Sequence, residues 1–155
     1  MSSIARAYQL SPDAVPALVE AATKKRGWFR RGVPFEETLA QQTRTLAPFA
    51  ADGFFVATAL GLSLTNRLRG HEDAATILTE RYQATHLFLT PSELGWLESL
   101  ERFTREDPKR LQQEFEAFNE YSTPDAGTGL AAAFRWLTDL RGSIGEGTHV
   151  LLIIG

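Results

Sequence analysis

The chain has no cysteine among its 155 residues and only one methionine. Disulfides, thiolate catalysis and cysteine metal sites are therefore excluded. Long apolar runs are also missing. The longest, residues 54–64, is interrupted by Thr58, Gly61 and Ser63, and it is far shorter than the roughly 20 residues that span a bilayer. Because the first residues also lack the apolar core of a signal peptide, we expect a cytoplasmic protein with no membrane partner.

No motif in the chain fixes a chemistry. Ser143 stands in a Gly-Ser-Ile-Gly turn that follows a predicted helix and precedes a predicted strand. That order is the reverse of a nucleophile elbow or a P-loop. His71, Glu72 and Asp73 could be metal ligands, but no second histidine stands at ligand spacing nearby. The sequence therefore predicts no metal and no cofactor.

The length and composition of the chain fit one domain, residues 1–155. Hydrophobic residues make up 43% of it and charged residues 23%, as in average globular proteins. Strands are predicted at residues 4–10, 86–89 and 150–154. The last is a run of five apolar residues between turn signals, which is typical of a strand buried on both faces. Helical spacing of apolar residues predicts helices at residues 12–23, 35–48, 54–69, 73–82, 94–103, 108–118 and 130–141.

The predicted fold class is α+β, with a small sheet that includes the N- and C-terminal strands and is packed with about six helices. The clearest local signal is Thr90-Pro91-Ser92-Glu93. Thr90 can cap a helix, Pro91 suits the first helical position, and Glu93 can close a capping box. Ser11-Pro12 opens an earlier helix in the same way. Either both preceding strands belong to one sheet, or Ser/Thr-Pro is simply a common helix start.

These two junctions carry a family resemblance. Residues 7–12, Ala-Tyr-Gln-Leu-Ser-Pro, and residues 87–94, Leu-Phe-Leu-Thr-Pro-Ser-Glu-Leu, resemble the strand-to-helix junctions of the YfbM-like proteins, a family of uncharacterised bacterial proteins (domain of unknown function 1877). The acidic stretch 106–121, the helix at 130–141 and the terminal residues 147–152 are also similar to that family. The resemblance implies an α+β fold without an established enzyme activity. The family's central pattern, a tryptophan followed by Leu-His-hydrophobic-Leu-Leu-Thr-Gly, is absent here.

Charge is distributed unevenly along the chain, whose net charge is −3. Residues 1–50 carry seven Lys/Arg and four Asp/Glu, whereas residues 51–155 carry nine and fifteen. The absence of a clustered basic face over most of the chain argues against nucleic acid as a partner. The acidic helices are either a solvated surface or a docking face for a basic protein. Small domains of this kind resemble the immunity proteins of bacterial toxin systems. This is an analogy between kinds of protein and not a likeness of particular residues.

The first hypothesis is a protein-binding module, an immunity-type or inhibitor-type partner of a basic protein such as a toxin. Acidic residues would give a fast, electrostatically steered association, and Trp96 or Tyr121 would be an aromatic anchor. The proposed contact residues are Glu93, Trp96, Glu98, Glu101, Glu106, Asp107, Glu114, Glu116, Glu120 and Tyr121.

The second hypothesis is a small enzyme or ligand-binding domain. Its pocket would lie near Arg81, His86 and His149, since both histidines sit beside predicted strands. The basic segment 24–31 could grip phosphate or a base, or its charges could oppose a helix dipole while its aromatic residues pack. Binding ranks ahead of catalysis, and the sequence indicates neither the oligomeric state nor the identity of a partner.

Overall fold

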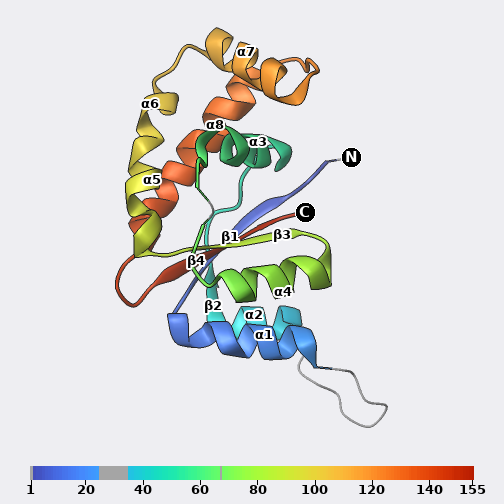
Figure 1. Ribbon diagram of the computed structural model, residues 1–155, viewed down its shortest axis with the longest axis vertical. Helices are drawn as coiled ribbons and strands as arrows, with labels where there is room; N and C mark the ends of the chain where they lie inside the picture. The colour runs from blue at the N-terminus through green and yellow to red at the C-terminus, as the bar shows by residue number, and fades with distance from the viewer. Residues whose placement is uncertain (1, 25–34, 67) are drawn as a thin grey trace.

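A computed structural model describes residues 2–24, 35–66 and 68–155. The α+β prediction is confirmed: a four-stranded antiparallel sheet of strand order β2-β1-β4-β3 lies between two groups of helices (Figure 1). The elements are β1 Ala5–Leu10, η1 Pro12–Ala14, α1 Val15–Thr23, α2 Phe35–Gln42, β2 Thr43–Thr45, α3 Phe54–Ser63, α4 Glu72–Tyr82, β3 Thr85–Leu89, η2 Pro91–Glu93, α5 Leu94–Ser99, α6 Glu101–Thr104, α7 Pro108–Asn119, α8 Ala126–Asp139, η3 Leu140–Ser143 and β4 His149–Ile154.

The two ends of the chain meet in the middle of the sheet, as predicted. Ile4 N donates to Gly155 O at 2.7 Å, and Gly155 N donates back to Ile4 O at 3.1 Å. β4 pairs with β1 on one side and with β3 on the other. Val150, Leu151 and Leu152 are fully buried. A strand in this position exposes neither edge nor face to water, which is why its sequence is a continuous apolar run.

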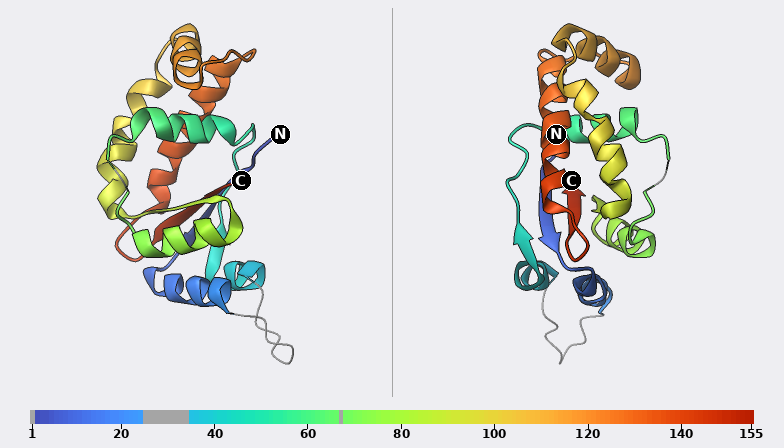
Figure 2. Two further views of the ribbon diagram at one scale, coloured as in Figure 1. Left: turned by 45° about the vertical axis from the view of Figure 1, so that its right-hand side comes forward. Right: turned by 90° about the vertical axis from the view of Figure 1, so that its left-hand side faces the viewer.

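Helices cover both faces of the sheet. α1, α2 and α4 lie on one face, and α3, α5 and α8 lie on the other (Figure 1). Successive side chains of a strand point to opposite faces. Leu151 accordingly belongs to the first core cluster, with Leu18 and Leu78, while Val150 and Leu152 belong to the second. α7 lies at the end of the molecule farthest from α1 and α2 (Figure 2).

The two capped junctions form as the sequence predicts. Ser11 accepts a hydrogen bond from Asp13 N, and Thr90 and Glu93 form a complete capping box. Both preceding strands flank β4 in the one sheet. The helices then diverge, because α1 packs on one face and α5 on the other. Pro16 falls within the first two positions of α1, where a missing N–H costs no hydrogen bond.

The predicted helix at 35–48 is wrong in its second half. α2 ends at Gln42, and Thr43–Thr45 forms the edge strand β2, with Thr45 opposite Tyr8 of β1. The segment Thr-Arg-Thr favours a strand, but it needs the open edge of β1 beside it to form one.

The boundaries of two other helices also differ from the prediction. α3 ends at Ser63, because Leu64 takes an extended conformation. α8 begins at Ala126 rather than Leu130. The glycines at the start of α8 are typical of a loop, yet they allow close packing. A Cβ on Gly127 would come within 2.0 Å of the Pro108 carbonyl oxygen at the start of α7.

Candidate functional site

The acidic residues of 93–120 do not form one continuous face. Glu93 is only 5% exposed. Its Oε2 accepts hydrogen bonds from the backbone N and from Oγ1 of Thr90, both at 2.6 Å. The carboxylate of Glu93 is therefore buried and hydrogen-bonded within the capping box, and the prediction that Glu93 contacts a partner is wrong.

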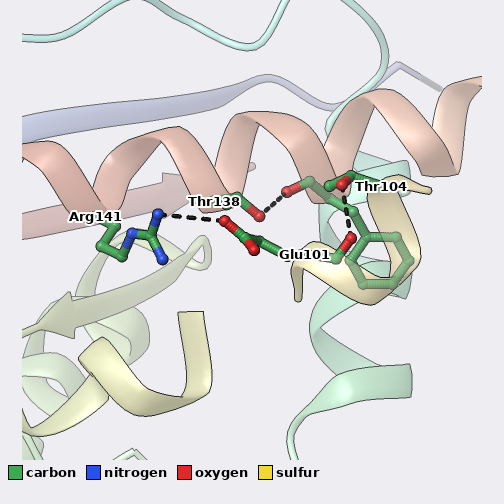
Figure 3. Close-up of polar contacts among 5 residues, drawn as sticks. Glu101, Thr104, Thr138 and Arg141 are labelled. Carbon is green, nitrogen blue, oxygen red and sulfur yellow. Dashed lines mark hydrogen bonds and ion pairs between the residues drawn. The ribbon is translucent and has the colours of Figure 1, made fainter. Parts of the chain in front are cut away.

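Glu101 is engaged by a residue of its own chain. Its Oε1 lies 3.4 Å from Nη2 of Arg141, which joins α6 to the end of α8 (Figure 3). In the same region Thr104 Oγ1 donates to the Glu101 carbonyl oxygen, and Thr138 Oγ1 donates to a carbonyl one turn back in α8. The two threonine hydrogen bonds each lie within one helix, so the Arg141–Glu101 contact alone joins the two regions, and it gives Glu101 a partner within its own chain.

Other proposed contact residues are also occupied or lie elsewhere. Glu106 pairs with Arg110 at 3.7 Å, and Asp107 caps α7 by accepting from Lys109 N at 2.9 Å. Trp96 is partly buried against the core, and Glu98 is exposed on α5, away from α7. These residues do not surround a common surface.

Three aromatic residues with exposed surface lie along the packed pair of α3 and α7. Phe54 is 37% exposed, Phe118 is 49% exposed and Tyr121 is 50% exposed. The rings of Phe54 and Tyr121 stack with centroids 6.1 Å apart. Phe118 lies over Gly61 of α3, where an added Cβ would come within 2.4 Å of its ring. We call Phe54, Phe118 and Tyr121 the aromatic face.

The helical spacing of Leu111, Phe115 and Phe118 puts all three on one apolar stripe, which predicts burial. Leu111 and Phe115 are buried, but Phe118 is not. It lies one residue before the end of α7, and the tip of its ring meets Gly61 of α3. Neither Phe118 nor Phe54 was a candidate from the sequence, since their exposure depends on how α3 and α7 pack.

After the first turn of α7, which holds Lys109 and Arg110, the chain near the aromatic face carries charge of one sign. Residues 53–66 contain no charged side chain, and residues 111–134 contain four acidic and no basic ones. Glu114 and Glu120 are exposed and form no ion pair with any residue in the described ranges. Glu114 lies in the middle of α7, and Glu120 directly follows the helix, where the helix dipole disfavours negative charge. Helix stability therefore does not explain their position.

Glu116 has a different environment from its two acidic neighbours. Ser122 Oγ donates to its Oε1 at 2.6 Å, and Gln112 Nε2 donates to the same oxygen at 2.8 Å. These two hydrogen bonds hold the pKa of Glu116 below its ordinary value. Glu116 thus fixes the turn after α7, and with it the position of Tyr121.

Arg81, His86 and His149 do not form one pocket. In the register of β3 on β4, His86 lies opposite Ile153, whereas His149 begins the strand. Four residues of strand separate these positions by about 13 Å, at about 3.3 Å per residue. Arg81 points to α1, where its Nε donates to Ala22 O at 3.2 Å. The predicted pocket common to all three is wrong.

His149 is instead paired with His71, the residue before α4. Nε2 of His71 and Nδ1 of His149 share a hydrogen bond of 2.8 Å, one donating and the other accepting. The His71 ring also packs edge-on against Phe88. Burial lowers the pKa of both histidines, and the charge of His71 lowers that of His149 further. Glu93 opposes this by raising both pKa values. No group of three or more potential metal ligands occurs in the described part of the chain.

We expect the protein to lose stability in mild acid. Burial lowers the folded-state pKa of His71, His86 and His149 below the ordinary 6.5. Near pH 6 and below, the unfolded chain binds protons more readily than the folded chain does, so the free energy of unfolding decreases as the pH is lowered. Each unit by which a folded-state pKa is lowered costs about 1.4 kcal/mol once the histidine is protonated in both the folded and the unfolded chain. Above about pH 7 this loss is absent. Urea unfolding between about pH 5 and about pH 8 measures it.

The control for this experiment is His149→Gln, whose amide can keep the hydrogen bond to His71 but does not titrate. The loss of stability between neutral and mildly acidic pH should be smaller in this variant. Equal unfolding free energies for the wild type at both ends of the pH range would contradict the expectation.

The basic segment 24–31 falls almost entirely outside the described residues. Lys24 is described, and it pairs with Glu20 one turn earlier in the chain at 2.9 Å. Among the described helices, none combines the length and the apolar character that crossing a membrane requires.

Comparison with known proteins gives no relative from which a function could be taken. No protein-family model, no curated protein and no solved structure matches this chain. The resemblance to the YfbM-like proteins stays a prediction that rests on the two strand-to-helix junctions and on the segments 106–121, 130–141 and 147–152.

Proposed function

We propose that the chain is a protein-binding module that takes a basic segment of a partner through the aromatic face and the carboxylates of Glu114 and Glu120. The supporting observation is the exposure of Phe54, Phe118 and Tyr121 in a region with four acidic and no basic side chains. Exposed large aromatic residues that cluster are unusual on a protein without a partner.

The chemistry of the partner follows from the two components. Aromatic side chains provide most of the binding energy when a partner covers them, and they lose little conformational entropy. Carboxylates at the rim contribute mainly to the association rate and to selection against acidic partners. The partner segment should therefore carry Lys or Arg around one apolar anchor. An immunity-type role would require, in addition, that this contact blocks the partner's activity. Because a cysteine-free chain suits a reducing compartment, we place the interaction in the cytoplasm.

Reversing the two rim charges should abolish most of the binding. The probe is a synthetic amphipathic peptide of Lys and Leu with one Trp, titrated calorimetrically at about 50 mM and about 300 mM salt. We expect the wild type to bind more weakly at the higher salt concentration. The double variant Glu114→Lys/Glu120→Lys should bind at least about tenfold more weakly and lose the salt dependence. Phe118→Ala should lose about tenfold at both salt concentrations.

The matched control is the double variant Glu98→Lys/Asp139→Lys. Both residues are exposed, and both lie on other helices, α5 and α8. The net charge changes equally, so a binding loss as large as that of the first variant would show that only overall charge matters. That result, or unchanged binding by Phe118→Ala, would reject the aromatic face as the contact.

A further inference from the structure

A hollow of about 410 Å³ lies on the other side of the molecule, between α2, the end of α4 and the sheet. Its floor is a row across three strands, in which Arg6 of β1 and His86 of β3 both pair with Ile153 of β4. Its walls include Phe35 of α2 and Tyr82, the last residue of α4. The size falls within the range of small-molecule sites. We call it the His86 hollow.

Aromatic rings dominate this hollow. The rings of Phe35 and Tyr82 lie 4.6 Å apart, and both face the imidazole of His86, at 6.4 Å and 5.9 Å between centroids. Tyr8 of β1 adds a fourth ring system to the lining. His86 also borders a second hollow along α4 and β3, where Phe88 is the only other aromatic residue that lines it. A flat ligand has its best packing partners in the first hollow.

His86 presents a hydrogen-bond acceptor that the protein leaves unused. Its side chain is only 2% exposed. Nδ1 lies 2.7 Å from Ala84 O. A carbonyl oxygen can only accept, so Nδ1 carries the proton and Nε2 of the neutral ring holds a lone pair. Nε2 makes no hydrogen bond to any residue within the described ranges. Burial also lowers the pKa of His86, which keeps the ring neutral. Nε2 is not among the fully buried polar atoms that lack a partner in the described residues, so water reaches it. A ligand N–H or O–H can replace that water with a direct hydrogen bond.

Two opposite charges stand in the lining of the His86 hollow. Arg6 is exposed on β1 and Glu36 is exposed on the first turn of α2. Neither forms an ion pair with another residue in the part of the chain that the structure describes. A guanidinium suits a carboxylate, and a carboxylate suits an ammonium group. The hollow thus offers an apolar lining with a hydrogen-bond acceptor. Its two opposite charges match the carboxylate and the ammonium group of a zwitterion.

We propose that the His86 hollow binds a free aromatic amino acid whose ring carries an N–H or O–H group. The ligand ring packs beside the paired rings of Phe35 and Tyr82 and donates to Nε2 of His86. The ligand carboxylate meets Arg6, and its ammonium group meets Glu36. This site is separate from the aromatic face, and it does not depend on the function proposed above.

Calorimetric titration with L-tryptophan, L-tyrosine and L-phenylalanine tests the ring donor. Tryptophan or tyrosine should bind, and phenylalanine should bind at least about tenfold more weakly, because it leaves Nε2 unpaired. The ¹⁵N resonance of His86 Nε2 should shift when the binding amino acid is added. Absence of binding by both donors up to about 5 mM, equal binding of phenylalanine, or an unshifted Nε2 resonance would each overturn the proposal.

The two charges are tested by pairing variants with ligand analogues. Arg6→Ala should weaken binding of the free amino acid about tenfold and leave binding of its amide unchanged, since the amide lacks the carboxylate. Glu36→Ala should do the same with the N-acetyl derivative, which lacks the ammonium group. Arg44→Ala and Glu37→Ala are matched controls, because both residues are exposed neighbours that do not line the hollow. Equal losses in variants and controls would show that these two charges do not contact the ligand.

Discussion

Deleting residues 150–155 should leave the chain unfolded. The deletion removes nearly all of β4, the strand to which β1 and β3 are both hydrogen-bonded. Five apolar side chains would be lost from the two cores, each contributing about 1.5–3 kcal/mol by burial. That sum is as large as the whole stability of a typical domain, about 5–15 kcal/mol. Circular dichroism and amide NMR dispersion of the purified chain would measure the loss.

The control for this deletion is the chain that lacks Gly155 alone. It keeps β4 and loses one hydrogen-bonded pair at the end of the sheet, Ile4 with Gly155. We expect it to fold, with a small reduction in stability. A folded chain ending at His149 would show that β4 does not hold the sheet together.

Replacing Gly127 by alanine should destabilise the protein by about 2–3 kcal/mol, the upper part of the range for an added methyl group in a packed interior. The new Cβ would lie 2.0 Å from the Pro108 carbonyl oxygen and 3.0 Å from Gln112 N. Both are backbone atoms of α7, so no side-chain rotation can relieve the overlap. α7 would have to move away from α8. Urea unfolding would measure the difference from the wild type.

Gly95→Ala is the matched control, since nothing lies within 4 Å of a Cβ at that position of α5. It should be neutral or stabilising by up to about 1 kcal/mol, because alanine favours helix over glycine. Equal effects of the two substitutions would contradict the close packing of α7 on α8. A displaced α7 should also weaken peptide binding in the Gly127 variant, since α7 carries Phe118.

The local patterns of the chain were readable because their physics is local. The capping box at Thr90 and Glu93 needs four consecutive residues, and it forms as the sequence predicts. The same residues misled the site prediction. Glu93 belongs to an acidic run in the sequence, but the hydrogen bonds to Thr90 remove its carboxylate from the surface.

The candidate sites could be predicted only in part. Tyr121 was a candidate anchor, and Glu114 and Glu120 were candidate contacts, because exposed acids and an aromatic at a helix end have a recognisable pattern. Phe118 followed helical spacing that predicts burial, but it lies at the end of α7, and the spacing alone does not show where along a helix the core ends. His86 was a candidate, but its ring partners Phe35 and Tyr82 come from separate helices.

The sequence by itself determined the α+β class, the doubly buried terminal strand and the capped starts of two helices, because each depends on hydrophobic spacing or on a few adjacent residues. Only the tertiary structure decided that His149 meets His71, that Phe118 stays exposed over Gly61, and that Arg6 and His86 lie opposite the same residue of β4. These pairings join residues far apart in the chain, and they follow from strand register and helix crossing, which local spacing does not specify.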